Sequence, residues 1–156
     1  CRWGRPSTSS KWPSSVRSMG EIAYVALGSN LGDRTRALAL ARAALRALPG
    51  TRVIAEPPVE ETAPFGPPGQ HPYLNQMLAI ETTLSPHELL AQLHDIERAA
   101  GRTRRVRWGP RTLYLYIVRF GDRTLRDDQL ELPRRGRVDR DFWEREVACL
   151  EAAMHE

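Results

Sequence analysis

The sequence is poor in cysteine and contains no long hydrophobic run. Its two cysteines, Cys1 and Cys149, stand at opposite ends of 156 residues and indicate neither a disulfide framework nor a metal site. No stretch approaches the roughly 18 consecutive apolar residues that a membrane-spanning helix needs, so no membrane partner is expected. With 41% hydrophobic and 27% charged residues, the composition predicts one globular domain in a reducing, cytoplasmic setting.

Acidic residues are missing from the first twenty positions. Residues 1–20 carry four basic side chains, which account for the whole formal net charge of +4, so the rest of the chain is neutral. Serines, prolines and the lack of apolar periodicity predict a disordered leader over residues 1–20. A transit peptide is the alternative, although its prolines disfavour an amphipathic helix. The domain then comprises residues 21–156, and its neutrality argues against nucleic acid as a partner.

Hydrophobic periodicity and turn residues predict the order strand-helix-strand-strand-helix-strand, followed by a short hairpin and a last helix. This order is typical of an α+β, ferredoxin-like fold, an antiparallel sheet with helices packed on one face. The predicted strands are 21–27, 51–56, 73–83 and 113–118, the hairpin is 124–125 with 130–132, and the helices are 34–48, 86–100 and 142–155.

Two polar stretches follow or begin strands. Gly28-Ser29-Asn30 lacks the lysine and the spacing of a P-loop, so a plain strand-to-helix turn is favoured over a phosphate loop. Tyr73 and Asn75 alternate on one strand after a stiff, proline-rich loop at 63–72. An aromatic face beside an amide suits a flat heterocyclic ligand, and an ordinary half-buried strand is the simpler alternative.

An arginine cluster leads into a strand with two unlike faces. Leu113, Leu115 and Ile117 alternate with Tyr114 and Tyr116, which predicts an aliphatic face toward the core and two tyrosines side by side on the other. The cluster could bind a triphosphate, track a nucleic-acid backbone, or form a solvated basic loop. Its members are Arg102, Arg104, Arg105, Arg107 and Arg111, with Trp108 among them.

Residues 22–120 resemble the 6-hydroxymethyl-7,8-dihydropterin pyrophosphokinase family, which transfers pyrophosphate from ATP to a pterin alcohol in folate biosynthesis. The family fold is ferredoxin-like. The matching pieces run from Ala23 to Arg34, from Glu61 to Pro64, from Tyr73 to Asn75, from Ile96 to Arg102, and through Arg107-Trp108-Gly109-Pro110-Arg111-Thr112-Leu113.

The resemblance implies roles for the matching positions. Thr62, Asn75 and the backbone around Pro64 and Phe65 would bind the pterin edge, and Tyr73 and Phe142 would sandwich its ring. Trp108 would lie on a mobile loop that closes over the site and excludes water. Arg102 and Arg111 are the expected catalytic residues, and the nucleotide and its phosphates would be held by Glu97, Arg102, Arg104, Arg111 and Arg140.

The resemblance fails at the metal site. The family continues this motif with two aspartates that hold two Mg2+ ions, and here those positions are Tyr114 and Tyr116. Mg2+ prefers charged oxygen ligands, so no metal-binding pair is intact and Mg2+ binding is doubtful, although ATP and Mg2+ are expected for the family. The family histidine after the Leu-Pro pair is Arg134, and the segment after Phe142 is atypical and shortened.

These departures lead to three hypotheses. The first is a pyrophosphokinase, an ATP-dependent transferase by descent, with impaired activity because metal and positioning contributions dominate phosphoryl transfer. The second is a non-catalytic module that binds a pterin or a nucleotide. The third and weakest is a polyanion binder that uses the arginines of 102–111. Small-molecule substrates and a monomeric state are expected for the first.

Overall fold

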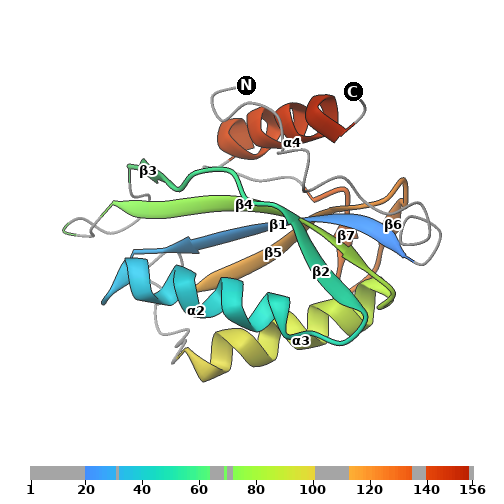
Figure 1. Cartoon of the computed structure of the whole chain (residues 1–156), viewed down its shortest axis with the longest axis horizontal. Coiled ribbons are helices and arrows are strands. Elements are labelled where there is room, and N and C mark those ends of the chain that lie inside the picture. Colours follow the sequence, from blue (N-terminus) through green and yellow to red (C-terminus); the bar gives the residue numbers. More distant parts are fainter. Residues whose placement is uncertain are drawn as a thin grey trace.

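The computed structural model describes residues 20–30, 32–63, 69, 72–100, 113–134 and 140–154. Three helices and seven strands lie in these ranges (Figure 1). The strands are β1 (Glu21–Ser29), β2 (Thr51–Ala55), β3 (Glu60–Thr62), β4 (Tyr73–Thr82), β5 (Tyr114–Phe120), β6 (Leu125–Arg126) and β7 (Glu131–Leu132), and the helices are α2 (Arg34–Arg46), α3 (Pro86–Ala99) and α4 (Arg140–Met154).

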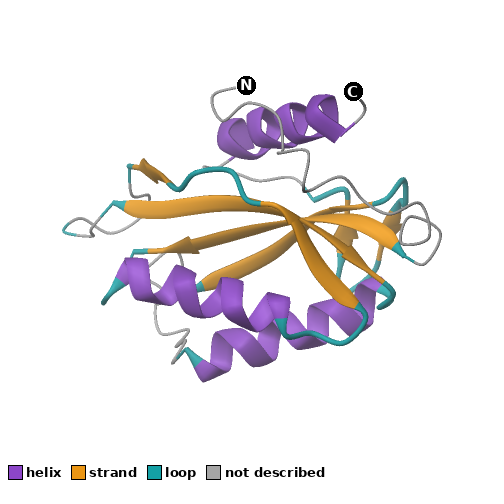
Figure 2. Ribbon diagram, in the orientation of Figure 1, coloured by secondary structure: helices purple, strands orange, loops and turns teal. Residues whose placement is uncertain are grey.

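The main sheet has the strand order β2-β4-β1-β5, with every neighbouring pair antiparallel. The short strand β3 also pairs with β4, beyond the end of β2. Helices α2 and α3 lie side by side on one face of this sheet (Figure 2). This arrangement confirms the predicted ferredoxin-like α+β fold, and it leaves β5 as an edge strand.

Helix α3 begins where its sequence predicts. The Ser85 side chain accepts a hydrogen bond from the Glu88 N–H at 3.2 Å, and the Glu88 carboxylate accepts one from the Ser85 N–H at 2.8 Å. This capping box, with Pro86 at the first helical position, satisfies donors that the helix itself cannot. The Glu88 pKa is lowered chiefly by the hydrogen bond that its carboxylate accepts from the Ser85 N–H, and next by one from the Ser85 side chain. The cap fixes the register of the helix face that carries Glu97.

The two faces of the sheet bury different side chains. The face toward α2 and α3 is almost wholly aliphatic, with Leu115, Ile117 and Phe120 from β5. The other face holds Tyr24, Met77 and Val118 and is covered by α4 through Phe142, Trp143, Val147 and Leu150. The prediction placed helices on one face, whereas α4 covers the opposite face. The near-continuous apolar run of β1 was the available signal, because a strand buried on both faces does not alternate.

Two further sequence expectations concern membranes and cysteine. Within the described ranges, none of the helices combines the length and the apolar character needed to cross a membrane. Cys149 on α4 is disulfide-bonded, which differs from the expectation that the cysteines indicate no disulfide framework. The other cysteine, Cys1, lies in 1–19, outside the described residues, together with nearly all of the expected leader.

Candidate active site

Tyr114 is the first residue of β5, and its ring extends over the neighbouring strand β1. Its side chain is 1% exposed. Gly28 of β1 pairs with Tyr114 on one side and with Asn75 of β4 on the other, so the three residues form a row across three strands. A Cβ on Gly28 would lie 1.9 Å from the Tyr114 ring. Because Gly28 has no side chain, the phenol can cross over β1 toward β4.

This crossing completes a chain of hydrogen bonds between the residues expected at the pterin edge. The Tyr114 hydroxyl donates to Asn75 Oδ1, and Asn75 Nδ2 donates to Thr62 Oγ1 at 2.5 Å. Asn75 is buried, and β3 pairs with β4 here through Thr62 and Tyr73. The structure thus brings Thr62, Tyr73 and Asn75 together as predicted. It also places the Tyr114 phenol on the carbonyl of Asn75, a residue that the sequence analysis expects at the pterin edge.

The aromatic side chains of this face form a continuous row. Tyr73 meets Tyr114 edge to face, with ring centroids 5.9 Å apart and an interplanar angle of 71°. Tyr114 and Tyr116 are 5.1 Å apart, which confirms that the two tyrosines lie side by side, and Tyr116 is 5.6 Å from Trp143. Phe142 is a buried residue of α4 itself, and the Arg145 guanidinium lies 5.5 Å from its ring. A sandwich of one ligand ring between Tyr73 and Phe142 stays a prediction.

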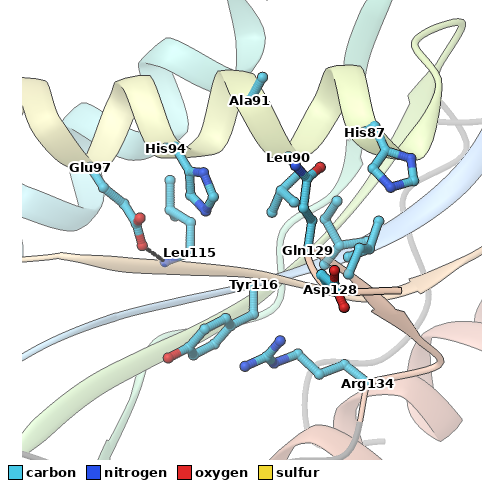
Figure 3. Close-up of a pocket in the computed structure, with 12 residues that line it drawn as sticks. His87, Leu90, Ala91, His94, Glu97, Leu115, Tyr116, Asp128, Gln129 and Arg134 are labelled. Carbon is cyan, nitrogen blue, oxygen red and sulfur yellow. Dashed lines mark hydrogen bonds between the residues drawn. The ribbon is translucent and has the colours of Figure 1, made fainter. Parts of the chain in front are cut away.

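A cleft of about 510 Å³ opens at the free edge of β5, between α3 and the hairpin β6–β7 (Figure 3). The buried carboxylate of Glu97 on α3 accepts a hydrogen bond from the Leu115 N–H at 2.8 Å. An edge strand leaves every second peptide group without a strand partner, and Glu97 takes one of these. The lining residues are His87, Leu90, Ala91, His94, Glu97, Leu115, Tyr116, Ile117, Asp128, Gln129, Leu130 and Arg134.

The register of β5 sets which backbone groups face this cleft. The pairing with β1 shifts between Tyr24 and Val25, so that Val118 is an extra residue in β5, a β-bulge. The Val118 carbonyl turns outward and accepts a hydrogen bond from the Arg134 N–H at 2.7 Å. Ile117, two residues after Leu115, has its N–H and C=O on the same outward side by the antiparallel alternation. The backbone N–H and C=O of Ile117 therefore face the cleft. On either side of them, the Leu115 N–H and the Val118 carbonyl already have hydrogen-bond partners.

Arg134 and Tyr116 lie together on the side of β5 away from α3 (Figure 3). The Arg134 guanidinium is 4.2 Å from the centroid of the Tyr116 ring, a cation–π distance. Two positions at which the sequence analysis expects a departure from the resembled family are thus in contact. The prediction treated Tyr116 and Arg134 as separate losses, whereas the structure makes them one unit.

The histidines of α3 were not singled out by the sequence. His87 and His94 lie seven residues apart on the helix face that also carries Glu97, and all three line the cleft. That i, i+7, i+10 spacing was the available signal. His87 Nε2 lies 2.7 Å from Asp127 Oδ2. The Asp127 pKa is lowered chiefly by hydrogen bonds from the Gln129 and Leu130 N–H groups, and by His87.

Several predicted site residues cannot be placed. Arg140 begins α4, but its side chain is not among those described. No group of three or more His, Cys, Asp or Glu side chains that could hold a metal ion occurs in the described part of the chain. The remaining predicted residues, Pro64, Phe65, Arg102, Arg104, Trp108 and Arg111, lie outside the described residues.

Residues 24–152 match the family model of 7,8-dihydro-6-hydroxymethylpterin-pyrophosphokinase. The chain belongs to this family. It is 42% identical over 120 residues to a 2-amino-4-hydroxy-6-hydroxymethyldihydropteridine pyrophosphokinase of Methylorubrum extorquens, a match that covers 77% of this chain and 76% of that protein. The enzyme of the same name from Bacillus subtilis is 42% identical over 124 residues, covering 80% and 74%.

One relative shows the family domain within a much longer polypeptide. The folic acid synthesis protein fol1 of Schizosaccharomyces pombe is 35% identical over 130 residues. The match covers 83% of this chain and 18% of that protein. Family membership confirms the sequence-based identification, and it supplies the chemistry against which Tyr114 and Tyr116 are weighed.

Proposed function

We propose that this chain recognises the two substrates of its family, ATP and 6-hydroxymethyl-7,8-dihydropterin, and transfers pyrophosphate between them only weakly. The observation that carries this proposal is the position of Tyr114. Its hydroxyl occupies the Asn75 carbonyl inside the group of residues expected to read the pterin edge. Pterin binding then has to displace a buried, hydrogen-bonded phenol, which costs free energy that an open site would not require.

The donor set at the expected metal positions does not fit Mg2+. Mg2+ takes near-octahedral oxygen ligands, usually from carboxylates and phosphates. The Tyr114 oxygen is committed to Asn75, and the Tyr116 ring is covered by the Arg134 guanidinium. Neither side chain supplies a carboxylate. We therefore assign no metal-dependent step to the described residues, and a slow transfer would depend on positioning and on cationic side chains.

The cleft at the β5 edge suits the nucleotide. Its volume is in the range of small-molecule sites, and it contains Glu97, the one expected nucleotide residue whose side chain is described. The outward-facing N–H and C=O of Ile117 offer a donor and an acceptor that can hydrogen-bond to the edge of a nucleotide base. The arginines of 102–111 remain the expected phosphate ligands on sequence grounds.

An assay of AMP release with ATP, Mg2+ and the pterin substrate tests this proposal. We expect a rate below that of an intact family member by about a thousandfold or more, because several kcal/mol of transition-state stabilisation are missing. The double variant Tyr114→Asp, Tyr116→Asp should regain metal binding and part of the rate. Turnover by the unmodified chain equal to that of an intact member would refute the impairment.

A second candidate is a non-catalytic pterin- or nucleotide-binding module, and the intact cleft beside Glu97 favours it. Calorimetry with ATP and with the pterin separates the two: binding without any AMP release supports the module, and no binding of either ligand eliminates it. A monomeric state, a cytoplasmic location and the lack of nucleic-acid binding stay predictions. Light scattering after size-exclusion chromatography and a DNA and RNA titration check the first and the last.

A further inference from the structure

Arg134 lines the cleft on the side of β5 away from α3, and its charge has no ion pair with a described residue. Its side chain is half-buried, and its contact in the described part of the chain is the Tyr116 ring at 4.2 Å. The backbone of Arg134 is anchored, because its N–H donates to the Val118 carbonyl at 2.7 Å. An arginine held at both its backbone and its guanidinium face loses little further entropy when it binds an anion.

The mode of contact leaves the guanidinium donors available. Stacking on an aromatic ring uses the face of the guanidinium plane, whereas its N–H groups point outward within that plane. Those in-plane donors match two phosphate oxygens at once. Trp143 lies 5.6 Å beyond Tyr116 and supports the ring from α4, so Tyr116 is a fixed platform for the cation.

The other charged groups of the cleft do not neutralise Arg134. Glu97 and the histidines lie on the α3 side of β5, whereas Arg134 and Tyr116 lie on the other (Figure 3). The Glu97 carboxylate is occupied by the Leu115 N–H, and His87 contacts Asp127. Asp128 also lines the cleft, but among the described residues it forms no ion pair with Arg134. Among the described residues that line the cleft, Arg134 is the arginine that an incoming anion would meet on this side.

We infer that Arg134, carried on the face of Tyr116, is a phosphate-binding residue of the cleft and lets this chain hold a nucleotide without a divalent metal. The inference rests on the proposed nucleotide occupancy of the cleft. In this arrangement a tyrosine at position 116 places a positive side chain beside the phosphates, where the family places a carboxylate that holds a metal ion. The ligand class is a nucleoside triphosphate or any compound that presents a linear polyphosphate.

Calorimetric titration of the full chain tests the inference with three probes: ATP, inorganic triphosphate and adenosine, each in EDTA and in excess Mg2+. The unmodified chain should bind ATP in EDTA within about threefold of its affinity in Mg2+. Arg134→Gln should weaken ATP and triphosphate about tenfold or more, as expected for one charge-assisted bidentate contact, and leave adenosine unchanged. Arg134→Lys should give an intermediate loss, since lysine keeps the charge without the planar fork.

Matched variants separate this role from a change in folding or in total charge. Arg126→Gln removes one positive charge from the same hairpin, where the side chain is 87% exposed, and should bind as the unmodified chain does. Tyr116→Leu removes the platform and should resemble Arg134→Gln. Melting curves confirm that every variant is folded before its titration is interpreted.

The outcomes are distinct. ATP binding that requires Mg2+, or that is unchanged in Arg134→Gln, would overturn the inference and leave the proposed nucleotide site standing. Loss of adenosine binding together with ATP binding in Arg134→Gln would also overturn it, because the residue would then support the whole cleft. No binding of ATP or adenosine by the folded, unmodified chain under either condition would overturn both the inference and the proposed nucleotide site.

Discussion

Tyr114 and Tyr116 are the same residue type on the same face of one strand, two positions apart, and their surroundings differ completely. Tyr114 is 1% exposed and points inward across Gly28 to a buried amide. Tyr116 is half-buried, lines the cleft, and carries a guanidinium on its ring. The first tyrosine fills the space beside Thr62 and Asn75 with a hydrogen-bonded phenol. The second forms part of the wall of the open cleft at the β5 edge.

The difference shows that one kind of substitution can have two physical outcomes. At position 114 the phenol donates an internal hydrogen bond to the Asn75 carbonyl, so under the proposed function a pterin would have to displace it. At position 116 the ring adds a surface on which a cation rests, so charge is gained beside the cleft. The neighbourhood decides the effect: a glycine and an amide surround one tyrosine, and an arginine and a tryptophan surround the other.

The largest difference between the two tyrosines should appear in stability. Tyr114→Ala empties a fully buried position and removes a hydrogen bond, so we expect the free energy of unfolding to fall by about 3–5 kcal/mol. Tyr116→Ala should cost about 1–2 kcal/mol, because its ring is only half-buried. Urea denaturation measures both. Equal losses would mean that the two positions are not distinct environments.

The hydroxyl of Tyr114 should have its own measurable effect. Tyr114→Phe leaves the buried Asn75 carbonyl without its donor, which should lower the free energy of unfolding by about 1–3 kcal/mol. Tyr73→Phe is the matched control, since its ring contacts Tyr114 but no hydrogen bond of its hydroxyl to a described residue occurs; it should change stability by less than about 0.5 kcal/mol. A similar cost for both variants would contradict the assigned hydrogen bond.

The pair at the open cleft should show a small coupling. A double-mutant cycle of Tyr116→Leu with Arg134→Gln should give a coupling free energy of about 0.5–1 kcal/mol, as for a partly exposed cation–π contact. The same cycle with Arg126→Gln in place of Arg134→Gln should give no coupling. A null result for the first cycle would show that the ring does not hold the guanidinium in solution.

The smallest expected effect is on the pH dependence of stability in acid, and it should arise at Glu21 and not at either tyrosine. The Glu21 pKa lies below its ordinary 4.5, chiefly because Arg123 donates hydrogen bonds to its carboxylate. A lowered folded-state pKa contributes stability that is complete above 4.5 and is lost as the pH falls through the folded value. Glu21→Gln should therefore flatten the acid limb of the stability curve, whereas Tyr114→Phe should leave its slope unchanged. Urea denaturation between pH 3 and 7 compares the slopes.

Local chemistry predicted most elements of the fold. A few neighbouring residues are enough to encode the capping box at Ser85, the alternation along β5 and the turn that separates β6 from β7. Each of these features occurs as expected. Helix α4 was predicted from Phe142 and begins two residues earlier, at Arg140. Its face of the sheet was not predicted, because that choice depends on apolar side chains contributed by strands distant in the sequence.

The sequence could suggest which residues form the candidate site, but not how those residues contact one another. Sequence motifs selected Thr62, Asn75 and Glu97, and the described structure places the first two in one hydrogen-bonded group with Tyr114. The reach of Tyr114 across Gly28 depends on the register of three strands, which no local pattern contains. The contact of Arg134 with Tyr116 likewise depends on the path of the hairpin β6–β7 and on the bulge at Val118.

The two hydrogen bonds at the free edge of β5 also bear on solubility. Exposed strand edges promote pairing with strands of other molecules, and proteins protect such edges with charges, bulges or covering segments. Here the Glu97 carboxylate takes the Leu115 N–H, and the Arg134 N–H takes the Val118 carbonyl beside a bulge. The accessible edge between these anchors is too short to template a strand from a second chain. It is nevertheless long enough for a small heterocycle, so under the proposed function the same two contacts that guard against aggregation would limit the size of the ligand.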